Sequence, residues 1–252
     1  MLKFYKMKGV ILAGGLGTRL RPLTHITNKH LLPVYNKPMI LYPLETLINS
    51  GIKEIMIVCG KEYGGSFMNF LGSGKEYGVK LSYALQEKND GGIADALSYA
   101  EDFADNKSIA VILGDNIFEE SFKKYLDNFK NGAMIFLKKV KDPERYGVPV
   151  FDKKGRIIKV EEKPKKPKSQ YAQTGFYIFD NKVFDFIRKQ KPSKRGELEI
   201  TDTINFYAKI KELRYAIVKK AWFDAGTINS LLEASNYIYK KLHKKAKYKS
   251  SF

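Results

Sequence analysis

Hydrophobic positions alternate between two patterns through the first 115 residues. Near-continuous apolar runs occupy residues 10–13, 55–59 and 109–113, and a further strand is expected at 79–85. Such runs are typical of strands that are covered on both faces of a sheet. The intervening stretches predict helices over residues 38–50, 67–71 and 93–103. This alternation predicts a mostly parallel sheet with helices on both faces.

The second half of the chain has a more mixed pattern. It predicts strands at 133–140, 148–151, 156–160, 175–179 and 214–218, helices at 183–190, 201–210 and 228–241, and a turn at 221–227. No linker-like change of composition divides the chain, and 252 residues can bury a substantial core. We therefore expect a single domain whose second half packs on the same sheet.

A glycine-rich run directly follows the first apolar strand. Residues 14–20 read Gly-Gly-Leu-Gly-Thr-Arg-Leu. The glycines let backbone N–H groups approach an anion, and Arg19 adds a planar cation that can hold phosphate oxygens. The dinucleotide fingerprint needs a glycine where Leu20 stands, and the P-loop needs a lysine before serine or threonine, so both patterns fail. A nucleoside triphosphate site is the favoured interpretation, and a plain strand-to-turn connection is the alternative.

Two carboxylates stand at strand ends. Asp115 follows a buried strand, and Asp224 lies in a turn of small residues. Because ligands of open α/β sheets bind beyond the carboxyl ends of strands, the glycine run and Asp115 should meet at one crevice. Mg²⁺ prefers one or two carboxylates plus phosphate oxygens, which these aspartates could supply together if they meet. A lone aspartate after a strand, such as Asp115, is equally often a turn residue or a helix cap. Four cationic side chains also lie in predicted turns, namely Arg19, Lys29, Lys163 and Arg195. A single lysine is more often a solvated surface charge.

Composition narrows the function classes. The net charge of +18 favours anionic partners, but the lysines are spread along the chain without a recognition-helix pattern, so no nucleic-acid partner is expected. No run approaches about 18 apolar residues, and no membrane span is expected. Residues 1–6 are expected to be an extension rather than a secretory leader. The single cysteine, Cys59, fits a buried thiol in a reducing cytoplasm, and His30 is expected to be structural.

Longer motifs carry a resemblance to a known family. They are residues 12–24 (LAGGLGTRLRPLT), 28–34 (NKHLLPV), 37–39 (KPM), 113–116 (LGDN), 142–147 (DPERYG), 161–164 (EEKP), 192–202 (PSKRGELEITD) and 222–227 (WFDAGT). With these motifs the chain resembles the sugar-1-phosphate nucleotidyltransferases, and most of all the glucose-1-phosphate thymidylyltransferases. The resemblance implies a Rossmann-like, three-layer α/β/α fold of the glycosyltransferase-A type with a mixed, mostly parallel central sheet. It also implies a homo-oligomer, either a dimer or a tetramer.

The resemblance implies a reaction and a division of the single domain 1–252. A sugar phosphate oxygen of glucose 1-phosphate would attack the α-phosphorus of dTTP in line, with Mg²⁺, and give dTDP-glucose and pyrophosphate. Residues from about 7 to 115 would bind the nucleotide, those from about 116 to 227 the sugar phosphate, and 228–252 would form a helix and a basic tail. The resemblance implies that the catalytic residues are Arg19, Lys29, Asp115, Lys163 and Asp224, and that the two aspartates hold the metal. The implied nucleotide-binding residues are Leu12, Gly14, Gly15, Gly17, Thr18, Arg19, Gln86, Gly92 and Asp115. The implied sugar-phosphate-binding residues are Asn116, Tyr146, Gly147, Glu162, Lys163, Gly175 and Arg195.

Three departures from the family pattern affect these expectations. The segment between Gln86 and Gly92 is about one residue longer than the common spacing, and Gln173 stands where many relatives carry valine, which alters the expected wall of the sugar pocket. The chain stops soon after residue 241, so we expect a short form without the C-terminal regulatory segment.

Other functions stay open at this point. A uridylyltransferase or a dual dTTP/UTP enzyme is the nearest alternative, because thymine and uracil share a hydrogen-bonding edge and one methyl group is worth only about 1–3 kcal/mol. A non-catalytic nucleotide-sugar sensor is the remote one.

Overall fold

The computed structural model describes residues 7–88 and 90–249, with side chains as far as Lys244. The expectations for residues 1–6, for Asn89 in the lengthened 86–92 segment and for the tail at 250–252 lie outside the described residues. A seven-stranded sheet forms the centre, in the order β12-β8-β11-β6-β1-β4-β5. Its strands are β1 (Lys8–Ala13), β4 (Glu54–Gly60), β5 (Lys80–Gln86), β6 (Ile109–Leu113), β8 (Ala133–Lys139), β11 (Tyr171–Phe179) and β12 (Leu213–Ile217).

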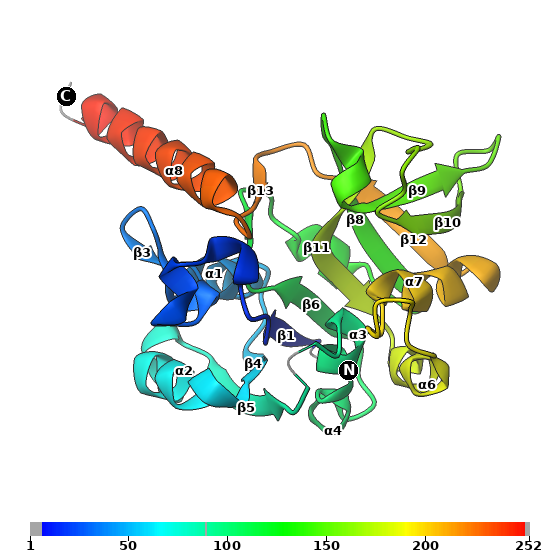
Figure 1. The fold of residues 1–252 in the computed structure, drawn as a ribbon, viewed down its shortest axis with the longest axis horizontal. Coiled ribbons are helices and arrows are strands. Elements are labelled where there is room, and N and C mark those ends of the chain that lie inside the picture. The colour runs from blue at the N-terminus through cyan, green and yellow to red at the C-terminus, as the bar shows by residue number, and fades with distance from the viewer. Residues whose placement is uncertain (1–6, 89, 250–252) are drawn as a thin grey trace.

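One strand of this sheet runs against the others. β1 pairs in parallel with β4 and β6, β4 pairs in parallel with β5, and β8 pairs in parallel with β12. β11 lies between β6 and β8 and is antiparallel to both. The sheet is therefore mixed and mostly parallel, as predicted, and it takes strands from both halves of the chain (Figure 1).

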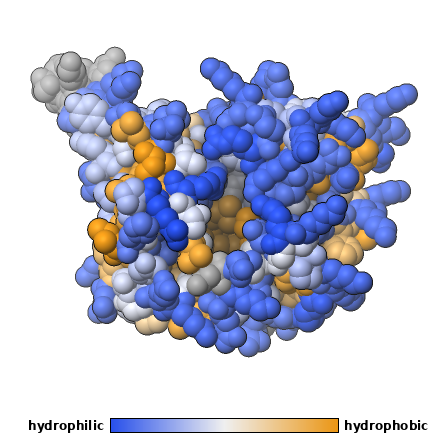
Figure 2. Space-filling view, viewed as in Figure 1, coloured by the Kyte–Doolittle hydropathy of each residue, from blue (hydrophilic) through white to orange (hydrophobic). Residues whose placement is uncertain are grey.

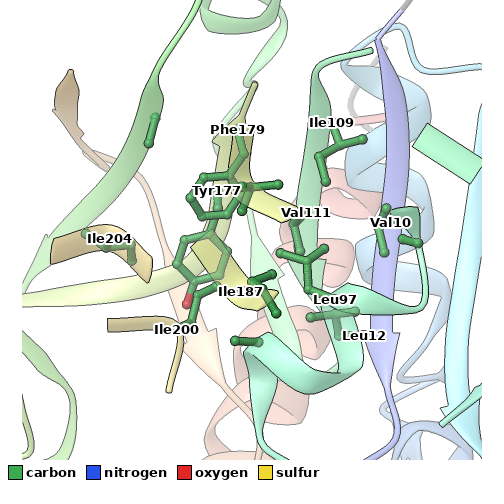
Figure 3. Close-up of a cluster of buried hydrophobic side chains, with 14 of the residues drawn as sticks. Val10, Leu12, Leu97, Ile109, Val111, Tyr177, Phe179, Ile187, Ile200 and Ile204 are labelled. Carbon is green, nitrogen blue, oxygen red and sulfur yellow. The ribbon is translucent and has the colours of Figure 1, made fainter. Parts of the chain in front are cut away.

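Helices cover both faces of the sheet because alternate strand residues face opposite cores. In β1, Val10 and Leu12 face one core, whereas Ile11 and Ala13 face the other. The first core includes Leu97 and Ile187 from helices on that face (Figure 3). Its helices are α3 (Ile93–Ser98), α4 (Glu101–Ala104), α6 (Lys182–Lys189) and α7 (Ile200–Lys209); those on the second face are α1 (Leu41–Asn49), α2 (Gly64–Leu71) and α5 (Lys123–Asp127).

Three short antiparallel ribbons lie beside the main sheet. They are β2 (Pro33–Val34) with β3 (Lys37–Pro38), β7 (Asn116–Phe118) with β13 (Trp222–Asp224), and β9 (Gly147–Phe151) with β10 (Ile157–Glu162). The long α8 (Ile228–Lys249) projects from the body (Figure 1). A third apolar cluster holds the base of α8, where Leu231 and Ala234 pack near Leu20 and Val34.

The structure corrects several predicted elements. The helix predicted at 38–50 begins at Leu41, because Lys37–Pro38 pairs with β2. The helix predicted at 93–103 is divided into α3 and α4, and between them the Ala100 N–H donates to the Leu97 carbonyl in a tighter, three-residue turn (3.0 Å). The predicted turn at 221–227 contains β13, and neither its partner β7 nor α5 was predicted.

Two further observations concern the single cysteine and the apolar character of the helices. Cys59 is fully buried, as expected, and burial raises the pKa of its thiol to about 11. Within residues 7–88 and 90–249, none of the helices has the length and apolar character needed to cross a membrane.

Candidate active site

A cavity of about 280 Å³ opens at the carboxyl ends of β1 and β6, where the sequence places the glycine run and Asp115. Figure 2 shows a hollow near the centre of the visible face, between two largely hydrophilic lobes. Most of the expected site residues line this one cavity: Leu12, Gly14, Gly15, Arg19, Lys29, Gln86, Gly92, Asp115, Asn116, Tyr146, Gly147, Glu162, Lys163, Gly175 and Asp224.

Three expected site residues do not line the cavity. Gly17 and the exposed Thr18 lie outside its lining, at the start of the short helical turn Thr18–Leu20. Arg195 lies in a neighbouring groove, where its Nη2 is 2.8 Å from Glu199 Oε1 and 3.5 Å from Glu162 Oε1. The structure thus places Arg195 one side chain away from the cavity, since Glu162 belongs to both surfaces.

The glycine run is closely packed against two side chains from elsewhere in the chain. A Cβ on Gly14 would lie 2.2 Å from Gln86 Oε1, and one on Gly15 would lie 3.3 Å from Lys29 Cε. Gly17 has a positive φ of 65°, and its Cβ would lie 2.8 Å from that of Lys29. Glycine is required here because only a bare backbone leaves room for Lys29 and Gln86 at the cavity wall.

The two candidate metal ligands meet through a short ribbon. Pairing of β7 with β13 sets Asp224 opposite Asn116, and the Ala225 N–H donates to the Asp115 carbonyl (2.9 Å). A Cβ on Gly226 would lie 3.0 Å from Asp224 Oδ1, 3.3 Å from Asp115 Oδ2 and 3.1 Å from Arg19 Nη2. Two carboxylates and one guanidinium therefore surround a single point that only a glycine leaves open.

The two carboxylates have opposite electrostatic environments. Burial alone would raise the pKa of Asp115, but the Lys29 ammonium, with Nζ 2.5 Å from Asp115 Oδ2, holds that pKa well below its usual range. Burial raises the pKa of Asp224, and the charge of Asp115 raises it further. Within the described residues Asp224 has no cation within 4 Å and accepts only the Gly226 N–H (3.2 Å). Asp224 is therefore a half-buried carboxylate whose oxygens have few partners and can still coordinate a cation.

This donor set fits a hard divalent cation that is also bound by phosphate. The described residues contain no group of three His, Cys, Asp or Glu side chains placed to hold a metal by themselves. Mg²⁺ is commonly held by one or two carboxylates, with waters and substrate phosphates completing its shell. A cation beside Asp224 would also relieve its repulsion with Asp115, so the residues present are compatible with Mg²⁺.

Asn116 forms hydrogen bonds with several groups beside the candidate metal ligands. Its Nδ2 donates to Asp115 Oδ1 (3.0 Å), and its Oδ1 accepts from the Gly175 N–H (2.9 Å) and from Trp222 Nε1 (2.7 Å). A Cβ on Gly175 would lie 2.7 Å from the Asn116 amide, so glycine is needed for this close approach. Asn116 was expected to contact sugar, and the structure shows that it orients the Asp115 carboxylate.

The β9–β10 ribbon supplies the opposite side of the cavity. Gly147 and Glu162 are paired across it, and the Lys163 N–H donates to the Tyr146 carbonyl (3.0 Å). Burial raises the pKa of Glu162, although Lys163 Nζ lies 3.6 Å from its Oε1. Lys163 has a positive φ of 42°, a strained conformation for a side-chain-bearing residue that is enriched at functional sites.

Gln86 and Gly92 lie at the end of the cavity expected to read the base. Gln86 Nε2 donates to Asp95 Oδ2 (2.8 Å), which fixes the amide while its oxygen faces Gly14. Gly92 has a positive φ of 91°, and a Cβ there would lie 2.6 Å from the Leu198 carbonyl oxygen. Both positions are therefore set by packing of α3 against the 196–200 segment.

Comparison with known proteins identifies the family of the chain. The sequence profile of the nucleotidyl transferase family matches residues 8–241. A glucose-1-phosphate thymidylyltransferase from Neisseria meningitidis is 44% identical over 238 residues, which are 92% of this chain and 82% of that protein. One from Mycolicibacterium smegmatis is 44% identical over 237 residues with the same coverage. The chain belongs to the nucleotidyl transferase family, among its glucose-1-phosphate thymidylyltransferases.

This nucleotidyl transferase also resembles solved structures. A Bacillus anthracis protein assigned as a glucose-1-phosphate thymidylyltransferase, solved in complex with a sucrose, is 51% identical with a TM-score of 0.87; the match covers 92% of this chain and 94% of that one. A UDP-glucose pyrophosphorylase complexed with UDP-glucose is 27% identical with a TM-score of 0.81, over 93% of this chain and 99% of that one. These structures confirm the predicted α/β nucleotidyltransferase fold.

Sequence reasoning missed several residues that line the cavity of this nucleotidyl transferase. Trp222 lies in the motif at residues 222–227, but its hydrogen bond to Asn116 depends on the pairing of β7 with β13. His30 is 2% exposed, and burial together with Lys29 lowers its pKa to about 3, so it is a buried neutral side chain, consistent with the structural role expected. Gln173, expected to alter the wall of the sugar pocket, also lines the cavity. The other lining residues that were not assigned a role are Ile93, Ala96, Leu113, Arg145, Tyr177 and Ile200.

Proposed function

We propose that this protein transfers a thymidylyl group from dTTP to glucose 1-phosphate, giving dTDP-glucose and pyrophosphate. The observation that carries the proposal is the convergence of Asp115, Asp224 and Arg19 on one point, with the glycine run beside them. The identity to two glucose-1-phosphate thymidylyltransferases over 92% of the chain supports the choice of substrates.

In this proposal an oxygen of the sugar phosphate attacks the α-phosphorus while the bond from that phosphorus to the β-phosphate oxygen breaks, and pyrophosphate leaves. The glycine run and Arg19 bind the triphosphate, and Lys29 adds positive charge at its wall. Asp115 and Asp224 would hold Mg²⁺, which supplies charge neutralisation when bound. Because phosphoryl transfer needs little covalent help, positioning and charge supply most of the rate.

The remaining residues divide between the two substrates. Gln86 would read the pyrimidine edge, since an amide can both donate and accept there. Glu162 would accept hydrogen bonds from sugar hydroxyls, and Lys163 and Arg195 would contact the sugar phosphate. The ion pairs of Arg195 with Glu199 and Glu162 mean that its guanidinium must exchange partners to reach a phosphate.

A uridylyltransferase is the second candidate. It is favoured by the similarity to the UDP-glucose pyrophosphorylase structure at 27% identity. Pyrophosphate release from dTTP, UTP, GTP and CTP at fixed glucose 1-phosphate tests both readings. We expect turnover with dTTP and weaker turnover with UTP, whereas a preference for GTP would overturn the assignment.

Two variants separate an enzyme from a non-catalytic nucleotide-sugar sensor. Arg19→Ala and Asp115→Ala should each lower kcat by about 10²–10³-fold, the usual effect of removing one electrostatic contact to a reacting centre. Near-normal kcat in either variant would contradict the phosphate and metal roles. The absence of product from the unaltered protein would favour the sensor.

A homo-oligomer, either a dimer or a tetramer, is part of the proposal. Large apolar side chains on the projecting helix α8 support it, because Leu232, Tyr239 and Leu242 are 59%, 48% and 42% exposed. Light scattering of the purified protein would give its mass in solution, and a strict monomer would contradict this expectation.

A further inference from the structure

One buried polar atom of the cavity wall has no partner. Among the described residues, Gln173 Oε1 is the single buried side-chain nitrogen or oxygen atom without a hydrogen bond. The Gln173 side chain lines the cavity although the residue is only 7% exposed. At the other end of the amide, Nε2 lies 3.4 Å from the Tyr177 hydroxyl oxygen.

The strand β11 places Gln173 on the wall of the cavity. Residues 173, 175 and 177 all line the cavity, as expected for alternate residues on one face of a strand. Thr174 points to the other face, where its Oγ1 donates to the Phe136 carbonyl (2.9 Å). Tyr177 is held in turn by stacking on Phe179, with ring centroids 5.8 Å apart (Figure 3). The backbone of Gln173 is held in the sheet by its pairing with Leu137 of β8, next to an irregularity in the β11–β8 register.

The residue that carries the free oxygen lies on the side of the cavity assigned to the sugar. A Cβ on Gly147, opposite Glu162 in the β9–β10 ribbon, would lie 3.5 Å from the Gln173 Cβ. A buried carbonyl oxygen without a donor is costly, and native proteins nearly always satisfy such groups. Because an amide oxygen only accepts, the molecule that satisfies it must bring an O–H or N–H group. A sugar hydroxyl is such a donor, and a phosphate oxygen is not.

We propose that Gln173 is a specificity-determining residue whose Oε1 accepts a hydrogen bond from one hydroxyl of the sugar phosphate. The inference rests on the proposed function, which brings a sugar phosphate to this wall. A sugar without that hydroxyl leaves the buried oxygen unpaired, so the enzyme discriminates against it. The effect is confined to one position of the sugar ring and does not extend to the nucleotide.

The test compares Gln173→Val with the unaltered enzyme on glucose 1-phosphate and on its 2-, 3-, 4- and 6-deoxy analogues. For one analogue, the unaltered enzyme should lose about tenfold or more in kcat/KM relative to the parent sugar. In Gln173→Val that ratio should fall close to one, while the ratios for the other analogues and the KM for dTTP stay unchanged. This pattern is a coupling between one side chain and one hydroxyl, which a general packing defect does not produce.

Thr174→Val is the matched control, because it removes a hydrogen bond from the other face of the same strand. It should lower stability and leave every sugar ratio unchanged.

If Gln173→Val does not fold, Gln173→Met keeps the length and volume without a polar end. Equal ratios in variant and unaltered enzyme, or one uniform change for all sugars, would overturn the inference. Failure of the unaltered protein to use any of these sugars with dTTP would instead overturn the proposed function, and this inference with it.

Discussion

Lys29 and Asp115 form an ion pair at the wall of the cavity, with 2.5 Å between Nζ and Oδ2 and side-chain exposures of 14% and 9%. Lys29 is fixed from the other side by Gly15 and Gly17 of the glycine run. A single lysine therefore connects the glycine run to the first candidate metal ligand, and its charge lowers the pKa of that carboxylate.

Lys29→Met should destabilise the protein by about 3–5 kcal/mol, because removing one partner leaves a buried charge uncompensated. Urea unfolding at pH 7 measures this change. The double variant Lys29→Met with Asp115→Asn should recover most of the lost stability and none of the activity. A single variant as stable as the unaltered protein would contradict the buried pair.

Asp224→Asn should stabilise the metal-free protein at neutral pH and abolish activity. The raised pKa of Asp224 means that its contribution to stability is present below the unfolded pKa and lost as pH rises through the folded one. The asparagine carries no charge to repel Asp115, so this loss disappears. Melting temperatures at pH 4 and pH 7 without metal measure the difference.

The same pair of proteins tests the metal. Mg²⁺ bound to the native state raises the melting temperature by mass action, and we expect this rise in the unaltered protein. The rise should be largely absent in Asp224→Asn. An equal rise in both proteins would show that Asp224 does not hold the metal.

Gly226→Ala should lower kcat and raise the Mg²⁺ concentration needed for half-maximal activity. Its Cβ would lie 3.0–3.3 Å from Asp224, Arg19 and Asp115, so these groups must separate to admit it. Gly65→Ala is the control, because a Cβ at this exposed position in α2 meets nothing within 4 Å. That control should keep full activity and gain about 0.5–1 kcal/mol from helix propensity. Equal activity of both variants would argue against a crowded metal point.

His30→Gln should flatten the fall of stability in mild acid. His30 is buried and neutral with its pKa lowered to about 3, so below pH 6.5 the unfolded chain gains a proton that the native protein does not. The unaltered protein therefore loses stability as pH falls, by up to about 1.4 kcal/mol per pH unit from this group. Urea unfolding between pH 7 and pH 5 gives both slopes, and identical slopes would contradict a neutral buried His30.

The parts of the fold predicted best from sequence are the strands buried on both faces. β1, β4 and β6 are continuous apolar runs because helices cover them from both sides, and their carboxyl ends locate the cavity. The ribbon β7–β13 could not be predicted, since Trp222 and Phe118 are neighbours only in the folded chain. For the same reason the sequence did not show that Asp115 and Asp224 meet.

Prediction of single site residues was limited by partners distant in the chain. Arg195 was assigned to the sugar phosphate from its motif, but the motif does not reveal that Glu199 and Glu162 hold its guanidinium beside the cavity. Asn116 was assigned to the sugar, which stays a prediction; the sequence did not show that its amide atoms also contact Asp115, Gly175 and Trp222. The roles of Gln86, Glu162 and Lys163 toward substrate stay predictions.

The position of β11 limits how this enzyme can be recombined with its relatives. A chimaera joined between residues 115 and 116 would keep the glycine run but take from another protein the strand that pairs with both β6 and β8. That strand also carries Gln173, Gly175 and Tyr177 of the cavity wall. Swapping halves in order to exchange sugar preference would therefore also replace part of the central sheet. Single side chains on β11 can be changed while its backbone hydrogen bonds to β6 and β8 stay in place.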